Sequence, residues 1–182
     1  MLDYENYPVI AAVRSKEHLA LALRSEVQTI FLLSSNIMDI EETCASVHKE
    51  NKLLFIHVDF VDGLSKDAAG VRYLSTMGVD GIISTRSNVI CAAKEAGICC
   101  IQRFFMIDSR SVDTAAESLR HTGADMIEIM PGLAYKAISR MQKLTDVPII
   151  AGGLIEYKEE IYQAINAGAA MVSTGKRELW ND

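Results

Sequence analysis

The sequence has no stretch that fits a membrane span or a secretion signal. Its longest apolar runs, such as residues 53–58, are far shorter than the roughly 20 residues that a membrane-spanning helix needs. The N-terminal residues, MLDYENYPVI, contain no basic region followed by an apolar one. We therefore expect a cytoplasmic protein that makes no contact with a membrane.

Cysteine is sparse, and linker-like segments are missing. The four cysteines show neither C-x-x-C spacing nor a paired pattern, and Cys91, Cys99 and Cys100 lie within ten residues of one another. No Pro-, Ser- or Gly-rich linker and no low-complexity tract interrupts the chain. We expect reduced thiols in the core of a single domain that spans residues 1–182.

Positive charge is in deficit. The chain has 18 Lys and Arg against 24 Asp and Glu, which gives a formal net charge of −6. No RNA-binding signature of the RRM or KH type is present. These features argue against a protein that is basic all over its surface, but they leave room for one local basic patch.

Eight short apolar segments recur along the chain. Their starts lie 18 to 28 residues apart, which is the spacing of a strand, a short helix and two loops. Most segments are apolar at consecutive positions, as expected for parallel strands that are buried on both faces. The eight predicted strands are residues 9–13, 29–33, 53–58, 81–84, 99–104, 126–130, 148–153 and 171–174.

Helical patterns with recognisable ends separate the predicted strands. The predicted helices are residues 16–24, 40–49, 68–77, 88–96, 114–121 and 133–144. The residues expected to begin them are Ser15, Asp39, Ser65 with Asp67, Ser87, Ser111 or Asp113, and Gly132. The residues expected to end four of the helical patterns are Gly78, Gly97, Gly123 and Gly168.

This eightfold alternation predicts a compact TIM-type (β/α)8 barrel of parallel strands and short helices. A length of 182 residues is below the usual size of such barrels, so the loops and helices must be short. A doubly wound sheet is the alternative fold. It would gain support from a G-x-G-x-x-G pattern after the first strand, and none is present.

The last two predicted strands end in loops of small residues. One apolar run ends at Gly152 and Gly153, and the next ends at Ser173, Thr174 and Gly175. Such loops expose backbone N–H groups, and in barrels the loops after strands 7 and 8 commonly form a phosphate site. The sequence therefore predicts a phosphate site near its C-terminal end.

Polar residues at the other strand ends are further candidates, because a barrel presents its site at the C-terminal ends of its strands. The cations among them are Arg14, Arg86, Arg103, Lys136 and Lys176, and their convergence on one face of an acidic protein favours an anionic ligand. The remaining candidates are Ser34, Ser35, Asn36, His57, Asp59, Asp62, Ser84, Thr85, Gln102 and Glu128.

Glu128 stands in the middle of the predicted strand MIEIM, where Ile127 and Ile129 take the opposite face. A carboxylate that faced the packed helices would be costly, so we expect Glu128 to point into the barrel. Arg103, at the end of the neighbouring strand, is its expected partner. The pair is either a structural ion pair or an acceptor for a ligand hydroxyl.

Signals for catalysis and for metal binding are weak. His57, Asp59 and Asp62 resemble metal ligands, but His18, His48 and His121 fall in helical patterns away from the expected mouth of the barrel. No predicted strand contains the lysine that Schiff-base aldolase chemistry needs, and no G-x-S-x-G or Walker pattern is present. We predict no catalytic residue, no metal and no cofactor.

Several long motifs carry a family resemblance. They are FIHVDFVDGLSKDAAGVRYL, DGIISTRSNVICAAKEAG, CIQRFFMIDS, IEIMPGLAYKAI, PIIAGGLI and VSTGKRELW. Together they resemble the glycerol uptake operon antiterminator regulatory proteins, which respond to glycerol 3-phosphate, over residues 9–180. The resemblance implies a small TIM-type barrel that senses glycerol 3-phosphate and acts on the leader mRNA of glycerol-utilisation genes to prevent premature termination.

The resemblance turns the predicted anion site into a site for the effector glycerol 3-phosphate. The residues expected to bind it through backbone donors and hydroxyls are Gly152, Gly153, Ser173, Thr174 and Gly175. Arg103, Lys136 and Arg14 add positive charge, and Glu128 or Asp59 accepts hydrogen bonds from the glycerol hydroxyls. The sequence itself identifies no RNA-contact residue.

Two other functions stay open. The chain could be an enzyme acting on a triose or sugar phosphate, with His57, Asp59 or Glu128 as acid and base. It could also be a phosphate-binding barrel that acts only through protein partners such as the transcription machinery. A homo-oligomer is compatible with each of these functions.

Overall fold

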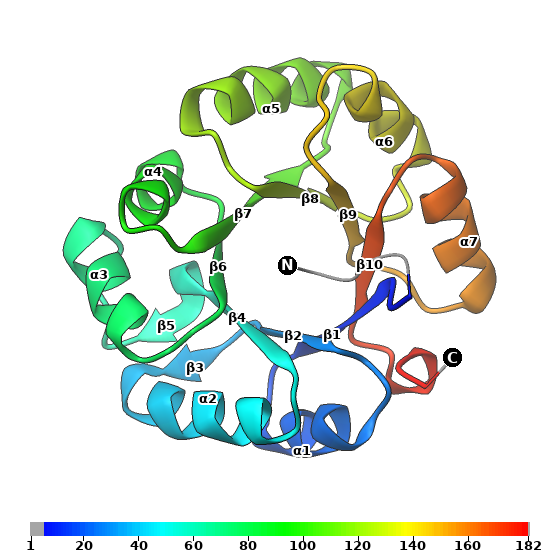
Figure 1. Ribbon diagram of the computed structural model, residues 1–182. Helices are drawn as coiled ribbons and strands as arrows, with labels where there is room; N and C mark the ends of the chain where they lie inside the picture. The colour runs from blue at the N-terminus through cyan, green and yellow to red at the C-terminus, as the bar shows by residue number, and fades with distance from the viewer. Residues whose placement is uncertain (1–5, 182) are drawn as a thin grey trace.

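Eight parallel strands close into a barrel in the computed structural model, which describes residues 6–181 (Figure 1). Each strand pairs in parallel with both of its neighbours, and β1 closes the ring against β10. The order around the barrel is β1 (Val9–Val13), β10 (Met171–Thr174), β9 (Ile149–Gly152), β8 (Met126–Met130), β7 (Cys99–Phe105), β6 (Gly81–Ser84), β4 (Leu53–His57) and β2 (Thr29–Leu32). The predicted (β/α)8 barrel is confirmed.

Seven α-helices of the described chain surround the barrel on its outer side (Figure 1). They are α1 (Lys16–Arg24), α2 (Ile40–Lys49), α3 (Ala68–Thr76), α4 (Ser87–Glu95), α5 (Ser109–Thr122), α6 (Tyr135–Gln142) and α7 (Lys158–Asn166). In the described residues after β10, through Asn181, the chain forms only η3 (Arg177–Leu179), a three-residue 3-10 helix. None of the helices in residues 6–181 has the length and apolar character needed to cross a bilayer.

Alternate residues of each strand point into the barrel and out toward the helices. The inward residues form one apolar cluster inside the ring, and the outward residues form a larger one with the inner faces of the helices. Burial on both faces explains why the strands are apolar at consecutive positions. The inner cluster consists of Ile10, Phe31, Phe55, Ile83, Ile101, Met126, Ile150 and Met171.

The helix ends follow ordinary capping chemistry. The Ser15 hydroxyl accepts from the His18 N–H, and the Asp67 carboxylate accepts from the Ala69 and Gly70 N–H groups. These two predicted starts are confirmed. The four glycines expected after helical patterns all have positive φ: Gly78, Gly97, Gly123 and Gly168.

Three predicted helix starts are wrong. Helix α5 begins after Asp108, whose carboxylate accepts from the Ser111 N–H in a capping box, so Ser111 lies inside the helix. Ser87 is the first residue of α4, and α6 begins after Ala134 instead of Gly132. Before α5 several capping residue types stand close together, and before α4 and α6 the residues Arg86 and Ala134 make no side-chain cap, so local sequence does not identify these helix starts.

A second, two-stranded sheet was not predicted. It pairs β3 (Ser35–Asn36) with β5 (Val61–Asp62), outside the barrel and near α2 and α3 (Figure 1). The 3-10 helices η1 (Ile37–Asp39) and η2 (Val58–Phe60) flank this pair. The loops that follow β2 and β4 are therefore fixed to each other at the C-terminal end of the barrel.

Candidate functional site

A cavity of 380 Å³ opens at the C-terminal end of the barrel. Its walls come from the loops after β1, β2, β9 and β10, from residues of the strands β1, β7, β8 and β10, and from one residue of α1. The volume is within the range of small-molecule sites. The residues that line it are Ala12, Arg14, His18, Leu33, Arg103, Glu128, Met130, Gly153, Leu154, Ile155, Glu156, Ser173, Gly175 and Lys176.

A buried polar network forms the floor of this cavity. Arg103 and Glu128 are paired residues of β7 and β8, and Arg103 Nε donates to Glu128 Oε2 at 2.6 Å. Ser173 Oγ donates to Glu128 Oε1, also at 2.6 Å. Glu128 is 1% exposed, so the arginine charge and the serine hydroxyl compensate for the burial of its carboxylate. The predicted pairing of Arg103 with Glu128 inside the barrel is confirmed.

The guanidinium of Arg103 retains free donors. Within residues 6–181 it donates a hydrogen bond only through Nε, and its terminal nitrogens have no protein acceptor. Arg103 lines the cavity while only 7% of the residue is exposed. A guanidinium held this way can bind an anionic or hydroxyl-bearing ligand through two further nitrogens.

The absence of a side chain at Gly152 leaves room for the side chains of Glu128 and Ser173. A Cβ at this position would lie 2.3 Å from Glu128 Oε1 and 2.7 Å from Ser173 Oγ. The network between Glu128 and Ser173 therefore requires glycine at residue 152, although Gly152 is not itself on the cavity surface. The next residue, Gly153, has a φ of +78° and lines the cavity, and its carbonyl accepts from the Gly132 N–H at 3.0 Å.

Two further cations lie on the cavity wall. Arg14 follows β1, and Lys176 follows Gly175 after β10. The Lys176 Nζ lies 4.0 Å from a Glu178 carboxylate oxygen, an exposed and weak pairing. With Arg103, three cations therefore face the same space as two glycine-bearing loops.

Thr174 shapes the loop behind the cavity and does not line it. Its hydroxyl donates to the Ile155 carbonyl at 2.7 Å and accepts from the Lys176 N–H at 3.0 Å. Its carbonyl accepts from the indole N–H of the buried Trp180 at 2.9 Å. These bonds connect the loops after β9 and β10, which brings Gly153 and Gly175 to the same cavity.

His18 lines the cavity, so the expectation that it lies away from the mouth is wrong. It stands in the first turn of α1, and its ring meets the edge of Trp180 at a centroid distance of 6.4 Å. Trp180 follows η3, and η3 packs on α1. The contact joins the two ends of the chain, so no local pattern indicates it.

Asp59 and Lys136 are not brought to the cavity. Asp59 accepts from Ser84 Oγ and from the N–H and hydroxyl of Thr85, and these bonds fix the loop between β6 and α4. Burial would raise the pKa of Asp59, but the hydrogen bonds from Thr85 and Ser84 outweigh it and hold the pKa below its usual value. Lys136 lies on α6 in a separate depression beside Ile107.

Other candidates at the strand ends are also used elsewhere. Gln102 points outward from β7 and bonds Thr122, Ser118 and Ser87 under the helices. Arg86 Nε lies 3.5 Å from an Asp59 carboxylate oxygen. Among the described residues, no group of three His, Cys, Asp or Glu side chains is arranged to hold a metal ion.

His57 is buried beside the cavity without a hydrogen-bond partner. Its side chain points into the barrel, it is 1% exposed, and neither ring nitrogen meets a partner within residues 6–181. Burial and the neighbouring Arg103 charge lower the pKa of His57 to about 4, with Asp59 opposing them. The ring of Phe60 stacks on it at 5.0 Å.

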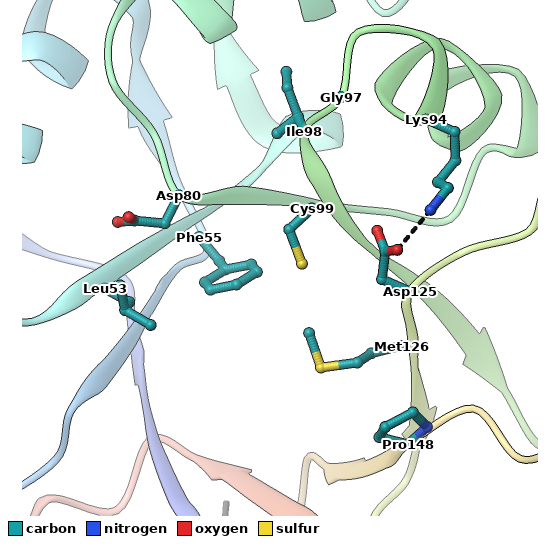
Figure 2. A pocket seen from close by; sticks show the side chains of 10 residues that line it. All are labelled: Leu53, Phe55, Asp80, Lys94, Gly97, Ile98, Cys99, Asp125, Met126 and Pro148. Carbon is teal, nitrogen blue, oxygen red and sulfur yellow. Dashed lines mark hydrogen bonds and ion pairs between the residues drawn. The ribbon is translucent and has the colours of Figure 1, made fainter. Parts of the chain in front are cut away.

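A larger cavity of 770 Å³ lies at the opposite, N-terminal end of the barrel (Figure 2). Phe55, Cys99 and Met126 point into it, and at its edge Lys94 Nζ donates to Asp125 Oδ1 at 2.6 Å. Burial raises the pKa of the Cys99 thiol to about 11, so it stays protonated and unreactive. An apolar cavity whose lysine is already paired does not suit an anion.

Comparison with known proteins identifies relatives over nearly the whole chain. A crystal structure of the glycerol uptake operon antiterminator regulatory protein from Listeria monocytogenes superimposes with a TM-score of 0.93 at 32% identity, covering 98% of this chain and 97% of that one. A glycerol uptake operon antiterminator-related protein from Thermotoga maritima gives 0.86 at 29% identity, with 96% and 98% coverage. YgcP, an uncharacterised Escherichia coli protein, is 37% identical over 95% of this chain and 91% of its own.

Aldolase barrels share the fold at much lower identity. The aldolase QR15 superimposes with a TM-score of 0.76 at 14% identity, which shows a common barrel architecture and nothing about chemistry. The family model described as glycerol-3-phosphate responsive antiterminator matches residues 9–180, from the first strand to Trp180. The chain belongs to the glycerol-3-phosphate responsive antiterminator family.

Proposed function

We propose that the chain is a cytoplasmic, glycerol-3-phosphate-responsive transcription antiterminator that binds its effector in the cavity at the C-terminal end of the barrel. The observation that carries the proposal is the convergence of three cations and two glycine loops on a 380 Å³ cavity, in a chain of this family. No resident cofactor or metal enters the proposal.

In this proposal the phosphate lies at the loops of Gly153 and Gly175. There the backbone N–H groups donate hydrogen bonds to it, and the positive charges of Arg14 and Lys176 stabilise its double negative charge. The glycerol end points down to the floor. There Arg103 donates from its free terminal nitrogens, and the carboxylate of Glu128 accepts from a hydroxyl. The ion pair of Arg103 and Glu128 then both stabilises the fold and binds the ligand.

We propose that the protein, once it has bound its effector, binds the leader mRNA of glycerol-utilisation genes. The support is the family and the related Listeria and Thermotoga proteins, whose names include glycerol uptake operon antiterminator. The net charge of −6 opposes non-specific RNA binding, so recognition would depend on a local surface and respond to salt.

The competing proposals are an enzyme acting on a triose or sugar phosphate and a barrel that acts only through protein partners. The fold shared with aldolases supports the enzyme, but no barrel strand in residues 6–181 carries the lysine of a Schiff-base mechanism. Turnover of triose or pentose phosphates by the wild type, lost in Glu128→Gln, would favour the enzyme.

Calorimetric titration with glycerol 3-phosphate tests the effector site. We expect binding by the wild type, weaker binding by Arg103→Ala, and unchanged binding by Arg120→Ala, because Arg120 is exposed on α5. At 100 times its dissociation constant the ligand should stabilise the fold by about 2.7 kcal/mol. Equal affinities of the two variants would refute this placement of the site.

Gel retardation of a leader RNA, with and without glycerol 3-phosphate, tests the output. Retardation that requires the effector supports antitermination through RNA. Effector binding without any retardation would leave a sensor that acts through protein partners, and would refute the proposed RNA target.

A further inference from the structure

His57 has a hydrogen-bonding deficit that the fold does not explain. It ends β4, one residue after Ile56, which faces the helices, and two after Phe55, which lies in the inner cluster. Its side chain therefore points into the barrel, where it is 1% exposed and both ring nitrogens lack a partner among the described residues. Buried polar groups without a partner are rare, because each loses its hydrogen bonds to water and gains none in the fold.

His57 lies next to residues that line the effector cavity, although it is not itself on the cavity surface. Leu33, which lines that cavity, follows Leu32, and Leu32 is the strand partner of Ile56, so Leu33 and His57 are next to each other in the register. Arg103 on the cavity floor is close enough for its charge to act on the imidazole. Phe60 covers one face of the ring, but the nitrogens lie in the ring plane and the stack does not satisfy them.

The imidazole at this place is neutral, because burial and the charge of Arg103 both disfavour its protonated form. A neutral imidazole has one donor and one acceptor nitrogen. A hydroxyl group can bond either nitrogen, since it both donates and accepts. A phosphate dianion can use only the donor, and the cations nearer the rim attract it more strongly.

We infer that His57 is a specificity-determining ligand contact, which hydrogen-bonds a hydroxyl of the bound phosphoester at the end of the cavity remote from the phosphate. The inference rests on the proposed effector site. Because His57 does not line the open cavity, the contact forms only when the ligand enters and the neighbouring side chains rearrange. Ligands with and without hydroxyls would then favour the rearranged state to different degrees, as a ligand-dependent response requires.

The test is a cycle of two ligands and two proteins, measured by calorimetry. Glycerol 3-phosphate and n-propyl phosphate share the phosphate, but only the first carries hydroxyls. We expect His57→Leu to weaken binding of glycerol 3-phosphate about three- to tenfold, the range for one neutral hydrogen bond, and to leave n-propyl phosphate within twofold. His121→Leu, which removes an exposed imidazole on α5, should change neither.

The outcomes separate this inference from the proposed function. If the wild type binds glycerol 3-phosphate and His57→Leu loses the same factor for both ligands, or loses nothing, the inference is wrong and the effector site stands. If the wild type binds neither ligand, the effector site is wrong and the inference falls with it.

A measurement on the wild type covers the case in which His57→Leu does not fold. The ring nitrogens of His57 can be followed by long-range ¹H–¹⁵N NMR, with the signals assigned by their loss in His57→Asn. Glycerol 3-phosphate should shift these nitrogens, and n-propyl phosphate should not. Equal shifts with both ligands, or none with either, would overturn the inference.

Discussion

Removing the charge of Arg103 should destabilise the fold far more than removing any exposed charge. In Arg103→Met the side-chain length is kept, but the carboxylate of Glu128, 1% exposed and bonded at 2.6 Å, loses its cation. Ser173 still donates to one carboxylate oxygen, while the other is left buried without a donor. Breaking a buried pair from one side costs about 3–5 kcal/mol, and we expect a loss in that range.

Urea denaturation at neutral pH measures this loss, with Arg120→Met as the control. Arg120 is exposed on α5, so its substitution should change the free energy of unfolding by no more than about 0.5 kcal/mol. The double variant Arg103→Met with Glu128→Gln should be more stable than Arg103→Met alone, because a neutral amide needs no cation. A cost below about 1 kcal/mol for Arg103→Met, or a double variant no more stable than the single one, would refute this account of the floor.

Two further predictions concern the same end of the barrel. Gly152→Ala should lower the free energy of unfolding by about 1–3 kcal/mol, because the added Cβ would meet Glu128 and Ser173. Gly175→Ala is the control and should stay near wild type, because its Cβ would contact only Ala12 O, at 3.5 Å. Equal melting temperatures of the two variants would contradict this prediction. His57 has a pKa of about 4 in the fold and near 6.5 when unfolded, so stability is lost as pH falls through this window. Between neutral pH and pH 4 the free energy of unfolding should fall by about 3 kcal/mol less in His57→Asn than in the wild type. Parallel curves of the free energy of unfolding against pH for the two proteins would refute the burial of a neutral imidazole.

The fold could be predicted because each of its signals is local. Strands of a parallel barrel are buried on both faces and therefore read as consecutive apolar residues, as in Cys99–Phe105 and Met126–Met130. The glycines after the helices carry positive φ, which other residues rarely adopt, so they mark the helix ends in the sequence. Helix starts are harder to predict, because several capping residue types precede α5, while α4 and α6 begin without any side-chain cap.

The floor of the cavity could be predicted from strand alternation, and the rest of the wall could not. Alternation places Glu128, Arg103 and Ser173 inside the barrel. It also places Gln102 outside, which corrects the expectation, based on its position at a strand end, that Gln102 belongs to the site. The same rule does not extend to loops and helices, where a residue's direction depends on contacts that are distant in sequence. For this reason the sequence predicts Lys136 at the cavity although it lies on another surface, and gives no indication that His18 lines the cavity.

The polar residues on the floor of the cavity make the barrel less stable than well-packed apolar side chains of similar volume would. The inner cluster below it is filled with isoleucine, phenylalanine and methionine, and apolar side chains at residues 103, 128 and 57 would continue that packing without any charge to compensate. Instead the barrel holds, toward its C-terminal end, an arginine with free terminal donors, a carboxylate paired with that arginine, and an imidazole that has no hydrogen-bond partner within residues 6–181. Buried polar groups without a partner require an explanation, and the proposed effector site supplies one, because a ligand at this end of the barrel would complete their hydrogen bonds.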